Sequence, residues 1–319
     1  MGIKNLISLI KSKAPSCIQT VPLSNYSNKT FAIDAYISFY ASSIAINFTK
    51  SNKILQDSEG NPTAHLIQIL NSTFLYRAHN ISPIWVFDGT PPELKEVELQ
   101  KRKNSKLLNA ENFSKASDEV SKQKFAARSW RLTDQMIKDS QDLLKFLGQD
   151  LIQAENEAEA QCAILCKTGQ ADLVISEDSD TLIFGTPLLA KGSKELTVID
   201  LNQILNELKL TMDQFIDLGI LLGSDYGPGI KGMGKVKALE FITKFKNIEN
   251  ICEQIKQVTK FQIPENFEYN KIRSFFKSPT VGTAQIIKSQ LDIENLQTFL
   301  HKKAFSEKAI TNYIKKLTP

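Results

Sequence analysis

Three short apolar runs along the chain predict buried β-strands. They are TFAID, IWVFD and ADLVISED, and they end at or near Asp34, Asp88 and Asp178. Apolar positions at helical spacing predict helices that separate these runs, at residues 65–79, 133–147 and 157–167. Continuous apolar strands that alternate with helices favour an α/β fold, with a central, mostly parallel sheet covered by helices on both faces.

The acids that end these strands are the first sign of chemistry. In an open parallel sheet the ligand site lies beyond the carboxyl ends of the strands, so Asp34, Asp88 and Asp178 should share one edge. Three carboxylates at one edge repel each other unless a cation neutralises them, and oxygen ligands select Mg²⁺, Mn²⁺ or Ca²⁺. For the stretch LVISEDSDTLIFG, the alternative is a surface turn between two strands.

Two further acidic motifs extend this candidate site. Glu157 and Glu159 in ENEAEA precede an apolar helix. Residues two apart do not share a helix face, so the pair can converge only in a loop or in a first helical turn. A solvated helix start favoured by the helix dipole explains the pair equally well. Asp225 follows an apolar helix in LLGSDYG, where an acid is electrostatically disfavoured, and this position indicates a functional role.

Positive charge is concentrated in one segment. The chain has 319 residues and a formal net charge of +4, and residues 95–131 alone carry ten Lys and Arg against five Asp and Glu. The segment has few large apolar residues, so it is predicted to be an exposed helical insertion that contacts a polyanion. Lys95 and Arg102 are seven residues apart and would lie on one side of a helix that points both cations toward the carboxylates. The alternative is an ordinary solvated helix face.

The stretch GIKGMGK at residues 229–235 has the glycine and lysine spacing of a nucleotide-binding P-loop. Val236 replaces the Ser or Thr that would hold Mg²⁺, and a helix precedes the stretch where a P-loop has a strand, so this interpretation fails. The pattern instead predicts two helices joined by a glycine-rich hairpin, at about residues 213–245. The N–H groups that begin the second helix suit one phosphate of a nucleic-acid strand, and a plain helix hairpin is the alternative.

The composition excludes several classes of protein. The four cysteines are scattered without a CxxC pair and the three histidines form no cluster, so we expect neither a disulfide framework nor a zinc site. No apolar run approaches the roughly 18 residues that a membrane span needs. The hydrophobic and charged content is ordinary for a soluble protein in a reducing compartment.

Six motifs in chain order together resemble the flap endonuclease family of structure-specific five-prime nucleases. They are MGIKNL, FAIDAYISFY, WVFDGTPPELK, ENEAEAQC, EDSDTLIFG and LLGSDYGPGIKGMGKVKA, and the match continues to IPENF and FSEKAI near the C-terminus. The resemblance implies hydrolysis of DNA phosphodiester bonds with two Mg²⁺ ions, for which Mn²⁺ can substitute. The metal ligands that it implies are Asp34, Asp88, Glu157, Glu159, Asp178, Asp180 and Asp225.

The resemblance also implies how DNA is held. Lys95 and Arg102 would reach the scissile phosphate from a helical arch and act in catalysis with Asp180, and Tyr40 would stack on a base beside that phosphate. Further DNA contacts are implied at Gly2, Glu157, Gly223, Asp225, Gly232, Gly234 and Lys235. Carbonyl groups of the helix-hairpin-helix would bind a K⁺ ion. The implied parts are an N-terminal nuclease region (1–94), the arch (95–131), an internal nuclease region (132–250) and a helical C-terminal part of the same domain (251–319).

Some positions depart from the family pattern. Asn47 and Ser72 stand where family members commonly carry arginines that contact DNA, which leaves the strength and position of those contacts open. The sequence contains no sliding-clamp motif, so clamp binding is not supported. We expect a monomer that acts in the nucleus, in DNA replication and repair.

We therefore predict a five-prime flap endonuclease and exonuclease that cuts DNA where a single strand meets a duplex. One alternative is a catalytically silent protein that binds DNA junctions. The seven acids argue against it, because like charges without ions destabilise a protein. The other alternative is a small-molecule phosphatase with Asp178 as its nucleophile. The sequence does not fix the preference among flap, nick, gap and bubble DNA.

Overall fold

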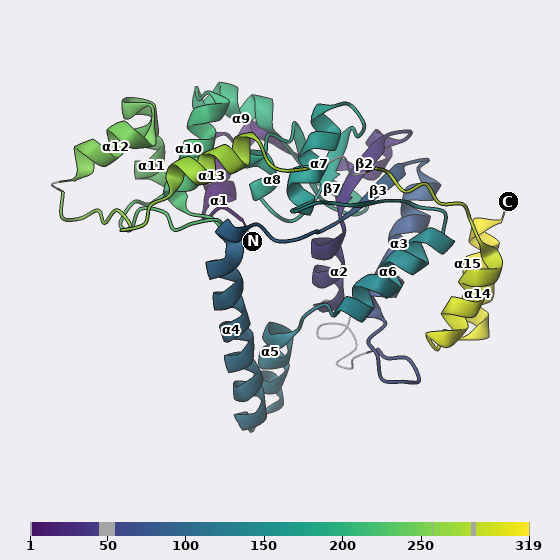
Figure 1. Ribbon diagram of the computed structural model, residues 1–319. Helices are drawn as coiled ribbons and strands as arrows, with labels where there is room; N and C mark the ends of the chain where they lie inside the picture. The colour runs from purple at the N-terminus through teal and green to yellow at the C-terminus, as the bar shows by residue number, and fades with distance from the viewer. Residues whose placement is uncertain (1, 45–54, 257, 282–284, 319) are drawn as a thin grey trace. The chain divides into compact units, whose positions relative to one another are not determined.

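The computed structural model describes residues 2–44, 55–256, 258–281 and 285–318, and Figure 1 shows its helices and strands. The chain forms two compact units. Unit 1 comprises Met1–Asn25, Asp88–Glu98 and Ala154–Thr283, and unit 2 comprises Tyr26–Phe87, Leu99–Gln153 and Ala284–Pro319. Among the described residues, no helix combines the length and the apolar character that crossing a membrane requires.

Unit 2 contains the strands that the first two apolar runs predict. Its strands are β2 (Thr30–Asp34), β3 (Ser82–Phe87) and β4 (Asp150–Gln153), which are parallel and follow the order β2-β3-β4. Its helices are α2 (Ala35–Ile44), α3 (Ala64–Ala78), α5 (Glu119–Ser129), α6 (Asp134–Phe146), α14 (Ile293–Lys302) and α15 (Glu307–Leu317). The apolar side chains of these strands are buried against helices. For example, Phe39 of α2 stacks on Trp85 of β3, with ring centroids 5.5 Å apart.

Unit 1 contains four strands in the order β1-β7-β6-β5. They are β1 (Ile18–Pro22), β5 (Leu173–Ile175), β6 (Leu188–Gly192) and β7 (Glu195–Asp200). The 3-10 turn η1 (Pro15–Cys17) precedes β1, and the 3-10 turn η2 (Leu23–Tyr26) follows it. The helices are α1 (Leu6–Lys13), α7 (Ala158–Lys167), α8 (Asp180–Ile183), α9 (Leu201–Leu208), α10 (Met212–Leu222), α11 (Lys235–Phe245), α12 (Ile248–Ile255) and α13 (Tyr269–Lys277).

The predicted fold class, a mostly parallel sheet with helices, is confirmed. The sequence pattern did not identify β1, β6 and β7, whose pairs β1–β7 and β6–β7 are antiparallel. These strands are short and mix apolar with polar positions, so their own periodicity is weak. They are defined by pairing across the sheet, such as Leu189 with Ile199, which a local pattern does not reveal.

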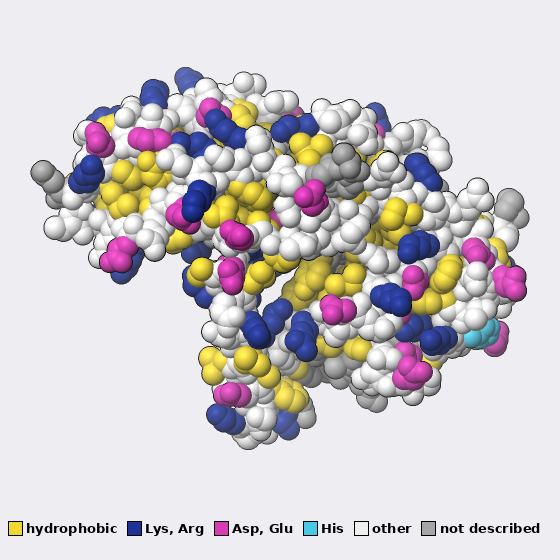
Figure 2. All heavy atoms as spheres, in the orientation of Figure 1, with side chains coloured by type: hydrophobic (Ala, Val, Ile, Leu, Met, Phe, Trp, Pro, Cys, Tyr) yellow, Lys and Arg dark blue, Asp and Glu magenta, His cyan; other side chains and the backbone are white. Residues whose placement is uncertain are grey.

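The basic segment forms the long helix α4 (Glu96–Lys115), followed by α5. None of the described residues of α4 is buried. Leu107, Leu108 and Phe113 of α4 and Val120 of α5 are exposed, and Figure 2 shows hydrophobic side chains at the surface over the far end of these helices. Lys95 ends the 3-10 turn η4 (Glu93–Lys95), which runs directly into α4 at Glu96. The predicted helical segment therefore carries both Lys95 and Arg102, and its first turn is a 3-10 turn.

The helix-hairpin-helix is formed by α10 and α11. A capping box between Thr211 and Gln214 starts α10. Gly223 ends it with φ +88°, and a Cβ at this position would lie 2.6 Å from the backbone nitrogen of Gly229. Only glycine therefore allows the chain to turn here, and the turn carries Asp225 immediately after the apolar helix.

One partly buried ion-pair network joins the helices around this hairpin. The guanidinium of Arg273 on α13 donates to both carboxylate oxygens of Asp217 on α10, at 2.7 and 2.9 Å. It also donates to both oxygens of Glu249 on α12, at 2.8 and 3.0 Å. Burial raises the pKa of Asp217 even though Arg273 opposes the shift, so this carboxylate depends on its cation.

We expect Arg273→Ala to lower the free energy of unfolding by about 3 kcal/mol, because it leaves a buried carboxylate without its partner. Urea denaturation followed by circular dichroism measures this change. The matched control is Lys237→Ala, which breaks the Lys237–Glu240 pair, whose side chains are about half exposed. It should cost no more than about 0.5 kcal/mol. The double variant Arg273→Ala with Asp217→Asn should recover part of the loss, and no recovery would contradict this explanation.

Candidate metal centre

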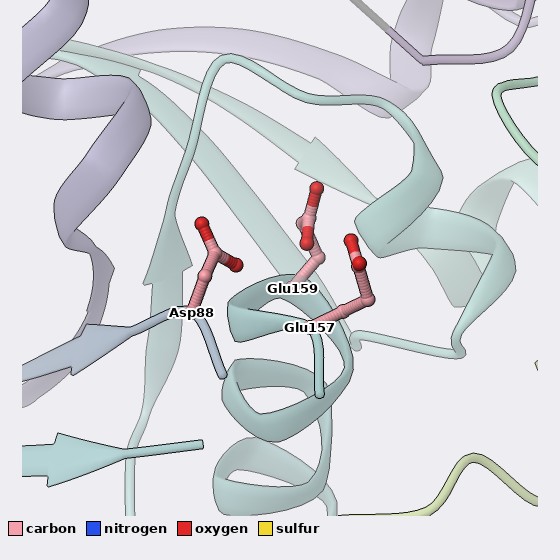
Figure 3. A group of neighbouring side chains, drawn as sticks. All are labelled: Asp88, Glu157 and Glu159. Carbon is pink, nitrogen blue, oxygen red and sulfur yellow. The ribbon is translucent and has the colours of Figure 1, made fainter. Parts of the chain in front are cut away.

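Asp88, Glu157 and Glu159 form the first cluster of carboxylates. One ligand oxygen from each lies within 4.8 Å of the others. Asp88 follows β3 and accepts a hydrogen bond from the backbone N–H of Ala158 at 2.8 Å. Glu157 is the N-cap of α7 and Glu159 lies in its first turn, so the helix begins between them and their side chains converge. Figure 3 shows the three carboxylates on the same side of the start of α7.

Asp178, Asp180 and Asp225 form the second cluster, with ligand oxygens again within 4.8 Å of one another. The backbone N–H of Asp180 donates to Asp178 Oδ1 at 2.9 Å, and the hydroxyl of Thr181 donates to the carbonyl oxygen of Asp178, also at 2.9 Å. These bonds fix the turn that follows β5 and start α8 at Asp180. The sequence LVISEDSDTLIFG is therefore a buried turn rather than the surface turn considered as its alternative.

Gly2 lies against the second cluster. A Cβ on Gly2 would stand 2.1 Å from Asp178 Oδ1 and 2.9 Å from the backbone nitrogen of Ser179. Its φ of +88° also disfavours any other residue. The backbone at Gly2 therefore packs against the turn that holds Asp178 and leaves no room for a side chain.

In both clusters the pKa of at least one carboxyl group is raised, so full ionisation of the carboxylates is disfavoured without a metal ion. Burial raises the pKa of Asp180 well above its ordinary value, and Asp178 and Asp225 raise it further. The pKa of Asp178 is also raised, first by burial. Asp88 keeps an exposed surface, but partial loss of solvation and the nearby carboxylate of Glu157 raise its pKa to about 6, against the hydrogen bond from Ala158. The Oδ1 atom of Asp180 is buried and accepts no hydrogen bond from any described residue.

Lys95 places a positively charged side chain beside the first carboxylate cluster. It is buried, and its ammonium donates to Glu157 Oε2. Burial alone would lower the pKa of Lys95, but the carboxylates of Glu159 and Glu157 outweigh it and raise the pKa, so the side chain stays charged. Lys95 was predicted to point toward the carboxylates, and from the turn η4 its ammonium reaches Glu157.

Six of the seven predicted metal ligands gather in these two clusters of unit 1, and the seventh, Asp34, lies at the end of β2 in unit 2. The buried carboxylate of Asp34 accepts a hydrogen bond from the backbone N–H of Ile37 at 3.2 Å. Tyr40 on α2 and Arg102 on α4 also belong to unit 2. Burial raises the pKa of the Tyr40 phenol, and the positive charge of Arg102 opposes this shift.

The predicted DNA-contact residues of the hairpin lie in unit 1. Gly232 has φ +87°, and a Cβ there would lie 2.3 Å from the carbonyl oxygen of Lys260. Gly234 is the N-cap of α11, with open space around the position of a Cβ. Lys235 begins α11, and its ammonium donates to the hydroxyl of Ser8. Gly234 is exposed, so α11 begins at the surface of the protein.

The two positions that depart from the family pattern differ in what the structure describes. Ser72 is buried on α3, and its hydroxyl accepts a hydrogen bond from Gln68 Nε2 at 3.0 Å. Asn47 lies outside the described residues.

Sequence reasoning missed Tyr226. This residue is 2% exposed, and its hydroxyl donates to Glu157 Oε2 at 3.3 Å. Burial raises the pKa of Tyr226 well above its ordinary value and the nearby carboxylates raise it further, so the phenol keeps its proton. The available signal was a large aromatic residue directly after Asp225, within an otherwise glycine-rich hairpin.

The chain is similar to known proteins over its whole length. The family model of the XPG N-terminal domain matches residues 1–109, and that of the XPG I-region matches residues 148–225. Flap endonuclease 1 of Heterostelium pallidum is 40% identical over 333 residues, which cover 99% of this chain and 85% of that protein. Flap endonuclease-1 from Methanococcus jannaschii has a TM-score of 0.72 and 26% identity, covering 94% of this chain and 95% of that one. The catalytic core of Rad2 in complex with DNA substrate has a TM-score of 0.76 and 25% identity, covering 99% and 100%.

Proposed function

Because this chain belongs to the flap endonuclease family, we propose that its two carboxylate clusters hold two Mg²⁺ ions beside the phosphodiester bond to be cut. The chain is a structure-specific five-prime flap endonuclease, a metal-dependent hydrolase of DNA phosphodiester bonds. The observation that carries the two-ion assignment is the convergence of six carboxylates into two groups of three within unit 1.

The chemistry of these side chains fits hard divalent cations. All six ligands offer oxygen, which favours Mg²⁺ or Mn²⁺ over zinc or copper. The buried Oδ1 of Asp180 accepts no hydrogen bond from a described residue, and raised pKa values indicate that the carboxylates lack sufficient positive charge. We assign one ion to Asp88, Glu157 and Glu159 and the other to Asp178, Asp180 and Asp225. Asp34 is a further ligand on the family resemblance alone.

The chain's own residues would bind and orient the phosphate. When bound, the ions would supply a water of lowered pKa and positive charge at the phosphate oxygens. Lys95 would offer its ammonium to the phosphate, and Arg102 on α4 is the second proposed cation. Each would contribute about 3 kcal/mol of transition-state stabilisation. The products would carry a five-prime phosphate and a three-prime hydroxyl.

The duplex would be held by the helix-hairpin-helix. The N–H groups that begin α11 next to Gly234 would bind one backbone phosphate, and hairpin carbonyls would bind the proposed K⁺ ion. Support for DNA as the partner comes from the similar Rad2 catalytic core, which was solved in complex with a DNA substrate. We also propose stacking of Tyr40 on a base, a monomeric state and a nuclear location, each of which rests on the family resemblance.

Product mapping on labelled DNA tests this proposal. We expect cleavage of five-prime flap, nicked and gapped duplexes in Mg²⁺, at or next to the junction, with no cleavage after addition of a chelator. Mn²⁺ should restore activity and Ca²⁺ should support binding with little turnover. Fluorescence anisotropy on the same substrates measures binding separately.

The two alternatives give different results in the same experiment. Tight binding to flap DNA without cleavage in Mg²⁺ or Mn²⁺ would indicate the silent junction binder. Turnover of a phosphomonoester such as p-nitrophenyl phosphate, without cleavage of any DNA, would indicate a phosphatase that uses Asp178. Either result would overturn the proposed two-ion mechanism.

A further inference from the structure

Tyr226 contacts two functional side chains of the metal centre at once. Its hydroxyl donates to Glu157 Oε2 at 3.3 Å, the same oxygen that accepts from the ammonium of Lys95. Its ring also lies under Lys95, with the ammonium nitrogen 5.4 Å from the ring centroid. One aromatic side chain therefore binds a proposed metal ligand with its polar end and the proposed phosphate-binding cation with its face.

The ring of Tyr226 is held from several directions by other aromatic side chains. Its centroid lies 6.2 Å from that of Phe184, which caps α8. Phe275 and Phe276 of α13 lie at centroid distances of 4.9 and 5.2 Å. The backbone N–H of Tyr226 donates to the hydroxyl of Ser224 at 3.2 Å, which fixes the start of the hairpin turn. This packing restrains the ring and thereby holds the phenol oxygen beside Glu157.

The chemistry at Glu157 explains why a fixed donor matters. Glu157 is the N-cap of α7, but its side chain makes no capping hydrogen bond, so the helix does not orient the carboxylate. The two donors described at Oε2 are Lys95 and Tyr226. If Lys95 turns toward a phosphate, Tyr226 is the donor that stays and keeps the carboxylate in place.

We propose that Tyr226 is a positioning residue of the metal centre: its hydroxyl orients Glu157 for the cation, and its ring seats Lys95. This inference rests on the proposed two-ion function and adds a determinant of metal affinity to it. The hydroxyl and the ring have separate roles, so two substitutions separate them.

Tyr226→Phe removes the hydroxyl and keeps the ring. We expect the Mg²⁺ concentration that gives half-maximal flap cleavage to rise about tenfold. The KM for DNA should stay within about twofold, and saturating Mg²⁺ should restore kcat to within about threefold of the parent. Binding of Mn²⁺, followed by electron paramagnetic resonance without DNA, should weaken by a similar factor. This second readout does not depend on catalysis.

Tyr226→Leu also removes the ring. We expect it to lower kcat at saturating Mg²⁺ by a further factor of about ten, because Lys95 loses the surface on which it lies. The matched control is Tyr76→Phe, at a second buried tyrosine that lies on α3 of unit 2. It should leave both the Mg²⁺ dependence and Mn²⁺ binding unchanged. Thermal denaturation identifies variants that fail to fold, and for the tyrosine-to-phenylalanine pair Tm should match the parent.

The outcomes separate the positioning role from the proposed function. Parent-like Mg²⁺ dependence and Mn²⁺ binding in a folded Tyr226→Phe variant would overturn the positioning role, even if the parent cuts flap DNA. If the parent itself neither cuts DNA nor binds Mn²⁺, the two-ion function fails first. Weaker Mn²⁺ binding together with a raised Mg²⁺ requirement supports both.

Discussion

Asp180→Asn is expected to reduce flap cleavage in Mg²⁺ by about 1,000-fold or more, while raising the thermal stability of the metal-free protein. The loss of rate follows because a ligand of the proposed second ion disappears, and such an ion supplies several kcal/mol of transition-state stabilisation. Asparagine has nearly the shape of aspartate, so the buried position of residue 180 can be kept. Single-turnover cleavage of a labelled flap measures the rate.

The gain in stability has an electrostatic cause. Burial raises the pKa of Asp180 above its unfolded value, and Asp178 and Asp225 add to the shift. The folded chain therefore retains a proton that the unfolded chain releases above about pH 4. Stability of the metal-free protein must fall as the pH rises from about 4 toward the folded pKa, and the neutral asparagine removes this loss. Denaturation curves at pH 5 and pH 7.5, with chelator present, measure the effect.

Asp139→Asn provides a control with the opposite sign. Asp139 on α6 is also buried, but its carboxylate lies 2.5 Å from the buried ammonium of Lys303, which Asp57 approaches at 3.6 Å. Because Asp57 remains as a partner of Lys303, the loss of Asp139 should destabilise the protein by about 2 kcal/mol and leave the Mg²⁺-induced rise in Tm intact. Asp180→Asn should keep only part of the Mg²⁺-induced rise in Tm, because the first carboxylate cluster stays intact. If it destabilised the metal-free protein like Asp139→Asn, or kept the full rise of the parent, the second carboxylate cluster would not be a metal site.

Lys95→Ala is expected to lower kcat for flap cleavage by about 100-fold to 1,000-fold, with a smaller change in KM. The ammonium of Lys95 is the buried cation beside the carboxylates, and its positive charge would meet a phosphate whose negative charge grows in the transition state. Lys95→Arg keeps the charge but changes its shape and should recover only part of the rate. Rates at saturating DNA and Mg²⁺ isolate the catalytic step.

The same substitution should also destabilise the metal-free protein. The carboxylates of Glu159 and Glu157 keep the buried Lys95 ammonium charged. Removal of this ammonium leaves the two carboxylates to repel each other. Lys145→Ala is the control, since Lys145 is about half exposed and lies 3.9 Å from Asp142. It should change neither kcat nor Tm appreciably. A parent-like kcat in Lys95→Ala would exclude this side chain from catalysis.

The local sequence pattern was sufficient to predict the strands that consist of one continuous run of buried apolar residues. TFAID, SPIWVF and LVI became β2, β3 and β5, and the carboxylates at or after their ends followed from where such strands end. The convergence of Glu157 and Glu159 required a helix start between them, and α7 begins there. Whether the side chains of two residues two positions apart can converge follows from local backbone geometry alone.

Other features lay beyond local reasoning. Lys95 was expected on a helix, and the local pattern did not show that the first turn after Pro91 and Pro92 is a 3-10 turn that runs into α4 at Glu96. The strands β1, β6 and β7 depend on antiparallel partners and not on their own pattern. The buried pair of Lys303 and Asp139 joins residues more than 150 positions apart, with no motif at either one.

The sequence by itself determined the alternation of strands and helices, the oxygen-rich character of the site and the family to which the motifs point. These properties depend on residue type and on spacing within one or two turns of chain. Only the tertiary structure decided which donors meet each carboxylate: the ammonium of Lys95 and the hydroxyl of Tyr226 both reach Glu157, from 62 and 69 residues away. Burial and Coulomb interactions depend on distances in space, and packing of the whole unit sets those distances.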